Sequence, residues 1–376
     1  SNARIDEILT SLGFERVRNS ASGSSFAIPS WRALDVKEAA DLAEEVARIH
    51  GLDKLPDVPI KATQADFDKD AFQRIEELRT QLAYAGLFEI VSVSMMDEAG
   101  ATKDGVFAAS DLIRVSNPIS AELAVMRPSL LPGLLNAVRY NVARKNPNLG
   151  LFEIGHVFCA NPEKFPEERD ELAIAITGCV HPERYSAERC IQLDFFDLKG
   201  VLEAILMKRR LASYSFVPAE DPRFVRTCCA KLLIDGKEAG VLGEVAPALA
   251  KGMRLNSKLF VAIVQLDRLF AAKERSQYYV PVSLYPSVTR DIAFVAPSSL
   301  TNGQVLEFVR KERIPYLESA SIFDVFEGEA LGPGRKSLAY SFVFRSSERT
   351  LTDDEVNALY EKLRRRLAEG LKVELR

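Results

Sequence analysis

The chain has 376 residues, of which 47% are hydrophobic, and a formal net charge of −4. This length allows two or three domains with separate cores, and the small negative charge excludes a global electrostatic attraction to nucleic acid or to a membrane surface. No run of about 18 apolar residues predicts a membrane span, and no signal peptide is recognisable.

The N-terminal segment predicts a small, helix-rich domain over residues 4–60. Residues 1–3, Ser-Asn-Ala, have the form of an expression scar. The pattern that follows is already that of an amphipathic helix, so we expect the chain to be a fragment of a longer protein.

A helix is predicted over residues 35–50. Asp35 followed by Glu38 is typical of a capping box, and Gly51 predicts the C-terminal end of the helix. Its apolar stripe is Ala39, Leu42, Val46 and Ile49.

Four carboxylates accompany this helix: Asp35, Asp41, Glu44 and Glu45. The last three share an arc of about 100° opposite the apolar stripe. Asp35, at the expected N-cap, lies about 9 Å along the axis from Asp41. From spacing alone, a solvated helix face and a metal site both remain open, and the metal site includes a carboxylate-based metal hydrolase as one possible function.

The largest block, residues 66–275, predicts a mixed α+β domain with a largely antiparallel sheet. An Asp-Gly turn within 230–245 predicts a hairpin. The other expected elements are helix 69–86, strand 89–95, a helix after Pro132, strands 149–158 and 171–180, a strand-to-helix segment 194–210, and strand 259–267.

Residues 276–287 predict a linker, and residues 288–376 predict a ferredoxin-like domain of order β-α-β-β-α-β. The Gly- and Pro-rich stretch LGPGR (331–335) predicts a turn rather than a phosphate-binding loop. The expected elements are strand 289–295, helix 302–313, strands 319–327 and 336–345, helix 352–368 and strand 371–375.

The five cysteines contain no C-x-x-C spacing, so a zinc or redox centre is not predicted. We expect reduced thiols, which suit a cytoplasmic protein. His50, His156 and His181 lie far apart in the sequence and form no recognisable nucleophilic or metal-binding arrangement, so no catalytic residue is predicted. The cysteines are Cys159, Cys179, Cys190, Cys228 and Cys229.

Long stretches of the sequence resemble the bacterial phenylalanyl-tRNA synthetase β subunit family, in order over nearly the whole chain. The stretches that carry the resemblance are PSWRALDVKEAADLAEEVARIHGLDKLP, NPISAELAVMRPSLLPGLLNAVRYNVARKNPNLGLFEIGHVF, PERYSAERCIQLDFFDLKG, YPSVTRDIAFV, IFDVFEG and GRKSLAYSFVFRSSERTLTDDEV. The stretch DPRFVR (221–226) departs from the family pattern, which leaves any family role of Pro222 or Arg223 in doubt.

The resemblance implies the C-terminal part of that subunit, without its OB-like and editing domains. Residues 4–60 then correspond to the end of a small helical, metal-associated domain, 66–275 to a class II synthetase-like domain without catalytic residues, and 288–376 to a ferredoxin-fold anticodon-binding domain. The fold class is therefore expected to be α+β throughout.

The resemblance also implies a role within phenylalanine–tRNA ligase. The expected partners are a catalytic α subunit, in an α2β2 heterotetramer, and tRNA(Phe), but neither membrane nor DNA. ATP is expected to be used by the complex and not bound by this chain, and the fragment alone is expected to be inactive. The family's magnesium site, shared with the α subunit, falls on Asp35, Asp41, Glu44 and Glu45.

Strand alternation predicts which face of the last domain is open. In the strand 336–345, Leu338, Tyr340, Phe342 and Phe344 should face the helices. Ala339, Ser341, Val343 and Arg345 should then face outward. In the preceding strand, Phe323 and Val325 match the core set, which leaves Asp324 and Phe326 outward.

An outward Phe beside an outward Asp suits the recognition of single-stranded RNA. Phe326 can stack on a base, and Asp324 can accept two hydrogen bonds from the Watson–Crick edge of guanine, the first anticodon base of tRNA(Phe). We expect Ser341 to contribute to this face and Arg345 and Arg290 to contact phosphates. The domain has as many acidic as basic residues, so binding would have to come from specific contacts. A free-standing RNA-binding or regulatory module without a ligase partner remains an alternative.

Overall fold

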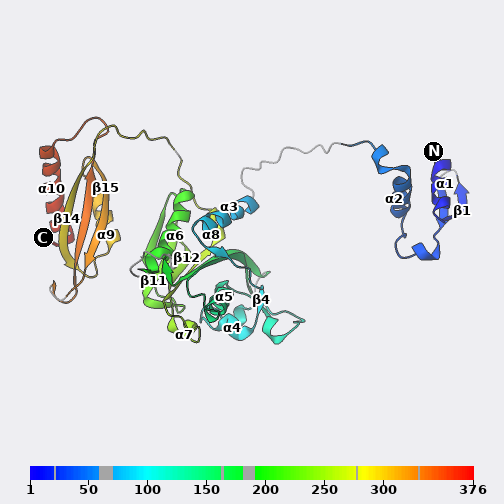
Figure 1. Cartoon of the computed structure of the whole chain (residues 1–376), viewed down its shortest axis with the longest axis horizontal. Coiled ribbons are helices and arrows are strands. Elements are labelled where there is room, and N and C mark those ends of the chain that lie inside the picture. The colour runs from blue at the N-terminus through cyan, green and yellow to red at the C-terminus, as the bar shows by residue number, and fades with distance from the viewer. Residues whose placement is uncertain (21–22, 59–70, 162–164, 181–190, 277, 329–330) are drawn as a thin grey trace. The chain divides into compact units, whose positions relative to one another are not determined.

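The structure, a computed structural model, forms two compact units, Ser1–Lys273 and Glu274–Arg376, whose elements are drawn in Figure 1. Among the described helices, none combines the length and the apolar composition that crossing a bilayer requires. The described residues are 1–20, 23–58, 71–161, 165–180, 191–276, 278–328 and 331–376.

The first 58 residues contain a small apolar cluster. Leu9, Phe14 and Val36 are buried at its centre, and Leu42 and Val46 of the predicted stripe pack against them. The elements are α1 (Asn2–Ser11), β1 (Glu15–Ser20), β2 (Gly23–Ala27), η1 (Ser30–Arg32), α2 (Ala39–His50) and η2 (Leu52–Lys54).

Helix α2 begins at Ala39, four residues later than the sequence predicts. The carboxylate of Asp41 accepts hydrogen bonds from the backbone amides of Lys37 (2.7 Å) and Glu38 (2.8 Å). These bonds satisfy amides that the start of a helix leaves without partners. The expected capping role of Asp35 is therefore wrong, because Asp41 holds the helix start and Asp35 lies in the preceding turn.

The rest of the N-terminal unit is built on a seven-stranded sheet of order β10-β11-β12-β13-β7-β6-β3. Its described strand pairs are antiparallel except β3–β6, which is parallel. The predicted hairpin is β11–β12, and Asp235 and Gly236 at its turn both have positive φ. The strands are β3 (Phe88–Glu89), β6 (Leu149–Cys159), β7 (Glu167–Thr177), β10 (Tyr214–Pro218), β11 (Phe224–Ile234), β12 (Lys237–Val245) and β13 (Leu259–Gln265).

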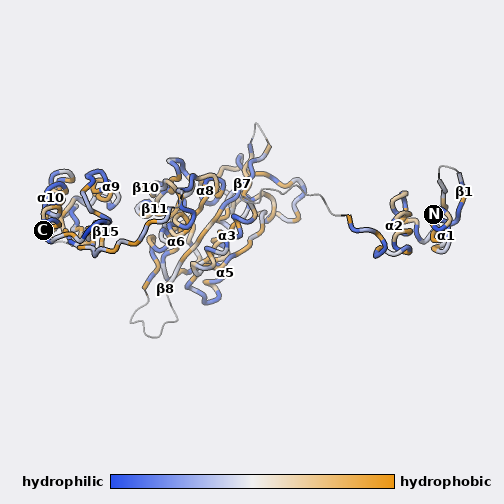
Figure 2. Tube along the Cα trace, turned by 90° about the horizontal axis from the view of Figure 1, so that it is seen from above, coloured by the Kyte–Doolittle hydropathy of each residue, from blue (hydrophilic) through white to orange (hydrophobic). Residues whose placement is uncertain are grey.

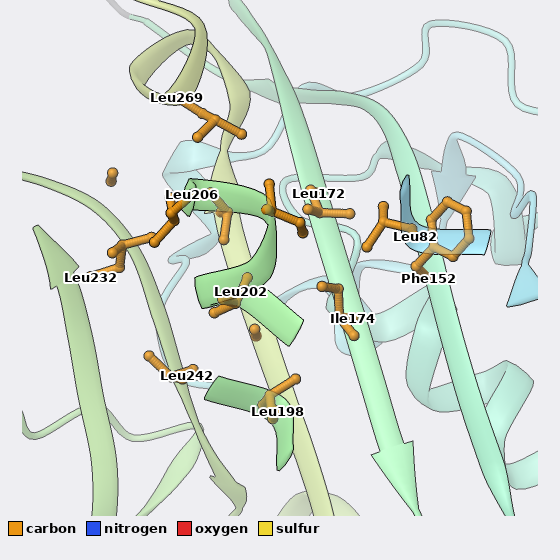
Figure 3. Packing of buried hydrophobic residues seen from close by; sticks show 14 of the residues in the cluster. Leu82, Phe152, Leu172, Ile174, Leu198, Leu202, Leu206, Leu232, Leu242 and Leu269 are labelled. Atoms are coloured by element: carbon orange, nitrogen blue, oxygen red, sulfur yellow. The ribbon is translucent and has the colours of Figure 1, made fainter. Parts of the chain in front are cut away.

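Helices cover both faces of this sheet. Leu172 and Ile174 of β7 join one buried cluster with Leu202 of α6, as Figure 3 shows, while Ala173 and Ala175 join a second cluster with α5. Consecutive residues of one strand thus enter opposite cores. The other elements are α3 (Ala71–Tyr84), β4 (Met95–Met96), α4 (Glu98–Thr102), η4 (Ala109–Asp111), η5 (Ala121–Leu123), β5 (Val125–Met126), α5 (Leu131–Ala143), β8 (Cys179–Val180), β9 (Ile191–Gln192), α6 (Phe195–Lys208), α7 (Pro247–Ala250) and α8 (Leu266–Phe270).

The strand predicted over 89–95 is largely absent. The chain leaves the sheet after Ile90, whose amide still donates to the carbonyl of Phe152 (2.8 Å). The backbone amide (3.1 Å) and the hydroxyl (2.9 Å) of Ser92 then donate hydrogen bonds to the carboxylate of Glu153. This side-chain partner replaces the ladder bonds that a longer strand would make.

The expectation of reduced thiols is wrong for one cysteine. Cys179 of β8 is disulfide-bonded, whereas Cys159, Cys228 and Cys229 are free. Cys190 lies outside the described residues.

The C-terminal unit confirms the β-α-β-β-α-β order. Its sheet has the order β15-β16-β14-β17 with antiparallel pairs, and the LGPGR segment forms the predicted turn, with positive φ at Gly332 and Gly334. The elements are β14 (Val288–Pro297), α9 (Asn302–Glu312), β15 (Leu317–Phe326), β16 (Arg335–Phe344), α10 (Asp353–Leu371) and β17 (Glu374–Leu375).

Candidate nucleic-acid interface and acidic cluster

One face of the C-terminal sheet is core and the other is open. On β16, Leu338, Tyr340, Phe342 and Phe344 are all buried and belong to a single cluster with residues of α9 and α10. Both helices lie on the same side of the strands in Figure 2. The alternation predicted for β16 is confirmed, so the residues between these positions line the face away from the helices.

The neighbouring strand β15 reaches the same alternation through two bulges. Its register against β16 shifts at Glu318 and again at Phe323, and each shift leaves one residue without a partner. Ile322 therefore pairs with Tyr340 and packs on the core, a place that the sequence analysis assigned to Phe323. That assignment is wrong: Phe323 is 59% exposed, and Val325, which the same alternation placed in the core, is 53% exposed.

Asp324 and Phe326 face outward, as expected. Asp324 pairs with Ala339 and Phe326 with Ser337, while Val325 between them pairs with the core residue Leu338. The Asp324 carboxylate is exposed and has no hydrogen-bond or ion-pair partner among the residues that the structure describes. Phe326 is 48% exposed, so both side chains are available to a ligand.

Ser341 belongs to the same patch. It stands two residues beyond Ala339 on β16, about 7 Å along the strand, and is half-buried between Ser321 of β15 and Asp291 of β14.

The two arginines predicted as phosphate contacts lie elsewhere. Arg345 follows β16 at its far end, about 20 Å along the strand from Ala339, and pairs with Glu318 (2.9 Å). Arg290 pairs with Phe342 across the sheet and so takes the helix side, where it binds Asp353 of α10 (3.0 Å). Three of the five predicted residues are thus together, and Arg290 is on the opposite face.

A cation that the sequence analysis missed lies nearer the patch. Arg335 begins β16 two residues before Ser337, and its half-buried side chain pairs with the exposed Glu374 at 2.7 Å. The outward-facing positions of β16 are 341, 339 and 337, and the same alternation continues to Arg335.

Two of the four predicted metal-binding acids, Asp35 and Glu45, lie in an ion-pair cluster. Glu45 is 7% exposed and pairs with Arg32 (2.6 Å) and with Arg48. These two guanidinium groups, Arg32 first, lower the pKa of Glu45 to about 2. Arg32 also binds Asp35 (2.8 Å).

Asp41 and Glu44 are placed differently. The amides of Lys37 and Glu38 lower the pKa of Asp41 through hydrogen bonds to its carboxylate. Glu44 is exposed. Among the described residues, no group of three His, Cys, Asp or Glu side chains is placed to hold a metal ion.

The four acids therefore do not fit a direct magnesium chelate. Arg32 and Arg48 neutralise Asp35 and Glu45, and one oxygen of Asp41 is used by the backbone. Magnesium takes one or two carboxylates and keeps several waters. Glu44 and the second oxygen of Asp41 are the groups that remain for such an ion.

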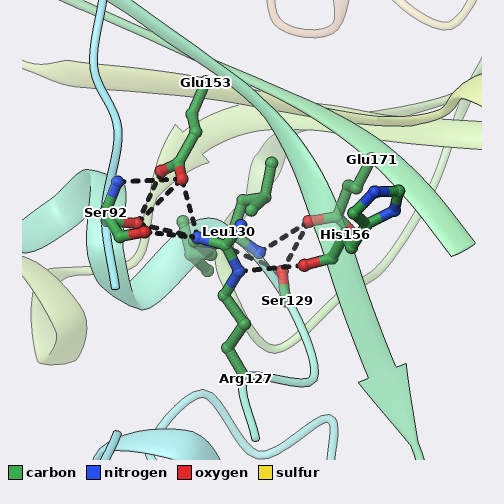
Figure 4. Close-up of polar contacts among 8 residues, drawn as sticks. Ser92, Arg127, Ser129, Leu130, Glu153, His156 and Glu171 are labelled. Atoms are coloured by element: carbon green, nitrogen blue, oxygen red, sulfur yellow. Dashed lines mark hydrogen bonds and ion pairs between the residues drawn. The ribbon is translucent and has the colours of Figure 1, made fainter. Parts of the chain in front are cut away.

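Arg127, Arg139 and Arg144 could offer positive charge to ATP phosphates, but Arg127 is structural. It is 6% exposed and donates to Glu153 (2.7 Å) and to the carbonyl of His156 (2.9 Å). Figure 4 shows this network and the adjoining bonds from Ser129 and Leu130 to Glu171, a carboxyl whose pKa burial raises. A guanidinium already paired in this way is not free to bind a phosphate.

Of the other two arginines, Arg144 packs its guanidinium over the ring of Tyr140, 3.3 Å from the centroid. Arg139 is exposed on α5. Arg127 and Arg139 both line one pocket beside α5, which Arg144 does not line.

Three family models match the chain. Residues 1–52 match the tRNA synthetase B5 domain, residues 54–266 the phenylalanyl tRNA synthetase beta chain CLM domain, and residues 283–376 the ferredoxin-fold anticodon binding domain. The open face described above lies within the last of these segments.

Curated relatives carry the name phenylalanine–tRNA ligase beta subunit. A protein from Streptococcus thermophilus is 33% identical over 100% of this chain and 46% of its own length. One from Lactiplantibacillus plantarum is 35% identical over 93% of this chain and 43% of its own length. One from Carboxydothermus hydrogenoformans is 34% identical over 94% of this chain and 44% of its own length. The chain spans slightly less than half the length of these relatives.

Proposed function

The chain belongs to the family of phenylalanyl-tRNA synthetase β chains, and from this membership we propose that it reads the anticodon of tRNA(Phe) and supports a catalytic α subunit. The assembled enzyme would be a cytoplasmic ligase of protein biosynthesis that charges tRNA(Phe) with phenylalanine at the expense of ATP. The observation that carries the proposal is the pair Asp324 and Phe326 on an open sheet face, within the segment that matches the anticodon-binding model.

The chemistry of this pair suits guanine. A carboxylate accepts hydrogen bonds from N1–H and from the 2-amino group of guanine, whereas adenine offers no such pair of donors on that edge. A half-exposed phenyl ring provides a stacking surface for an unpaired base. Because acidic and basic residues balance in this unit, specific contacts of this kind must supply the affinity.

We assign amino-acid activation to the α subunit. Activation needs cations on the ATP phosphates, and Arg127 is neutralised by Glu153 while Arg144 lies against Tyr140. We therefore infer that this chain alone neither binds ATP nor charges tRNA. The proposed assembly is an α2β2 heterotetramer, with tRNA(Phe) as the nucleic-acid partner and no membrane or DNA partner.

Magnesium is proposed to bind at the boundary with the α subunit, around Asp35, Asp41, Glu44 and Glu45. When bound, the ion would link the two subunits through water-mediated contacts. Within this chain, Arg32 holds Asp35 and Glu45 in place, so Asp41 and Glu44 are the carboxylates that would hold the ion. Tight magnesium binding by the isolated chain in calorimetry would contradict this assignment.

Phe326→Ala in the assembled enzyme tests the anticodon role. Loss of a stacking ring costs about 1–3 kcal/mol per base, so the KM for tRNA(Phe) should rise roughly fivefold to a hundredfold. The KM values for ATP and phenylalanine should not change, because those substrates are assigned to the α subunit. An unchanged KM for tRNA would remove the stacking role of Phe326.

A further inference from the structure

The bulge at Phe323 releases an aromatic ring from the core beside the proposed guanine-binding pair. In a regular strand, consecutive residues point to opposite faces, so Phe323 would alternate with the outward Asp324 and enter the core. Instead Ile322 takes the core position opposite Tyr340, and Asp324 is the next paired residue. Phe323 is the extra residue, and it is 59% exposed.

The place of β15 in the sheet keeps this ring open. The strand order is β15-β16-β14-β17, so β15 is an edge strand without a neighbour on its outer side. Phe323 is not among the residues that pack on the apolar cluster of this unit. Bulges at sheet edges commonly redirect a side chain or end strand pairing, and here the redirected side chain is a large aromatic one.

Three ligand-capable side chains thus fall within four residues: the rings of Phe323 and Phe326 and the carboxylate of Asp324. The two rings are three positions apart, which is about 10 Å along a strand. Successive nucleotides of an unstacked single strand can reach two surfaces at that separation. The unit has no excess of basic residues, so stacking must carry much of the affinity for RNA.

We propose that Phe323 is a second stacking surface, which takes the base adjacent to the guanine held by Asp324 and Phe326. This inference rests on the anticodon-reading function proposed above. The proposed role of Phe323 is to stack its ring on a base, whereas Asp324 recognises the guanine by hydrogen bonding.

The test uses the full chain and an RNA hairpin that has the anticodon loop of tRNA(Phe). In two versions of the RNA, 2-aminopurine replaces the base on one side or the other of the guanine, because its fluorescence is quenched when an aromatic ring stacks on it. The protein variants are Phe323→Ala, Phe323→Leu and Phe323→Tyr. Phe326→Ala reports on the proposed function itself, and Phe165→Ala, which removes another highly exposed ring (93%), is the matched control.

We expect Phe323→Ala and Phe323→Leu to weaken hairpin binding about fivefold to a hundredfold and to abolish quenching at one flanking position. Phe323→Tyr should restore both, since it keeps the aromatic face. Phe165→Ala should change neither. Because Phe323 is exposed, all these variants should keep the melting temperature of the unsubstituted chain.

The outcomes separate the two proposals. Weaker binding with Phe326→Ala but not with Phe323→Ala overturns the second stacking surface alone. If Phe323→Leu binds as tightly as the unsubstituted chain, Phe323 provides apolar contact without stacking, and the inference again fails. No hairpin binding by the unsubstituted chain, or no effect of Phe326→Ala, contradicts the anticodon-reading function and the inference with it.

Discussion

Asp324 and Phe326 offer a guanine two contacts that do not depend on the charge of the surrounding surface. A carboxylate without a partner among the described residues can accept from a base without first breaking an ion pair. The ring of Phe326, a residue that is already half-exposed, would give up few contacts with the protein when it stacks on a base. The two proposed contacts therefore depend on the neighbouring residues that hold the side chains of Asp324 and Phe326 in position.

The support of Phe326 can be tested at Gly328. A Cβ on Gly328 would lie 2.7 Å from Cζ of the Phe326 ring, so Gly328→Ala must displace that ring. We expect several-fold weaker binding of the anticodon hairpin with an unchanged melting temperature, because the displaced ring is the end of a movable side chain. Gly303→Ala in α9, whose nearest neighbouring atom is 3.9 Å away, is the control. Equal hairpin affinity for both variants would show that the position of the ring is unimportant.

Glu45 predicts an acid-sensitive N-terminal region. Its folded pKa, about 2, lies below the ordinary value of 4.5, so the stability that it contributes is complete above about pH 4.5 and is lost as the pH falls toward about 2. Glu45→Gln should lower stability at neutral pH but flatten the loss over this interval. Trp31, next to Arg32, is the only tryptophan, so its fluorescence reports on this region.

The control for this titration is Glu44→Gln, which changes an exposed acid on the same helix. Its acid profile should match that of the unsubstituted chain. If Glu45→Gln and the unsubstituted chain lose structure along the same curve, the pairs with Arg32 and Arg48 do not stabilise the fold.

At the scale of elements, β15 and β16 show what the sequence can and cannot predict. The strict alternation of β16 predicted its core face correctly, because each bulky residue follows the last by two. In β15 the same rule placed Phe323 in the core, since a bulge adds one residue without any marker in the sequence. Asp324 and Phe326 were still oriented correctly because the bulge lies before them.

The acidic cluster shows a second limit of sequence reasoning. Helical spacing brought Asp41, Glu44 and Glu45 to one face, but the partners of Glu45 include Arg32, which lies before the helix. Contacts between a helix and the chain that precedes it cannot be read from periodicity. For the same reason, the start of α2 at Ala39 was predicted four residues too early.

The Arg127–Glu153 pair predicts a large and recoverable loss of stability in the seven-stranded sheet. Glu153→Leu leaves a buried guanidinium without its carboxylate, which should cost about 3–5 kcal/mol. The double variant Arg127→Met with Glu153→Leu should regain a substantial part, because no charge is then left unpaired. Hydrogen exchange of the β6 and β7 amides measures both effects. If the double variant loses as much stability as Arg127→Met and Glu153→Leu lose separately when summed, the two side chains are not coupled and the interpretation fails.

At the scale of the whole molecule, the two units divide the proposed work. The C-terminal unit has its own apolar core and carries the proposed RNA-reading face, while the N-terminal unit carries the acidic cluster and the seven-stranded sheet. The chain spans slightly less than half the length of its curated relatives, and we assign charging to the proposed assembly with the α subunit.

The most direct test of the central claim combines one change in the protein with one in the RNA. Anticodon hairpins containing guanine or inosine, which lacks the 2-amino group, are bound to the unsubstituted chain and to Asp324→Asn. A hydrogen bond to a charged group contributes about 1.5–3 kcal/mol, so inosine should weaken binding to the unsubstituted chain roughly tenfold to a hundredfold and binding to Asp324→Asn much less. An equal loss in both proteins would contradict the reading of guanine by Asp324.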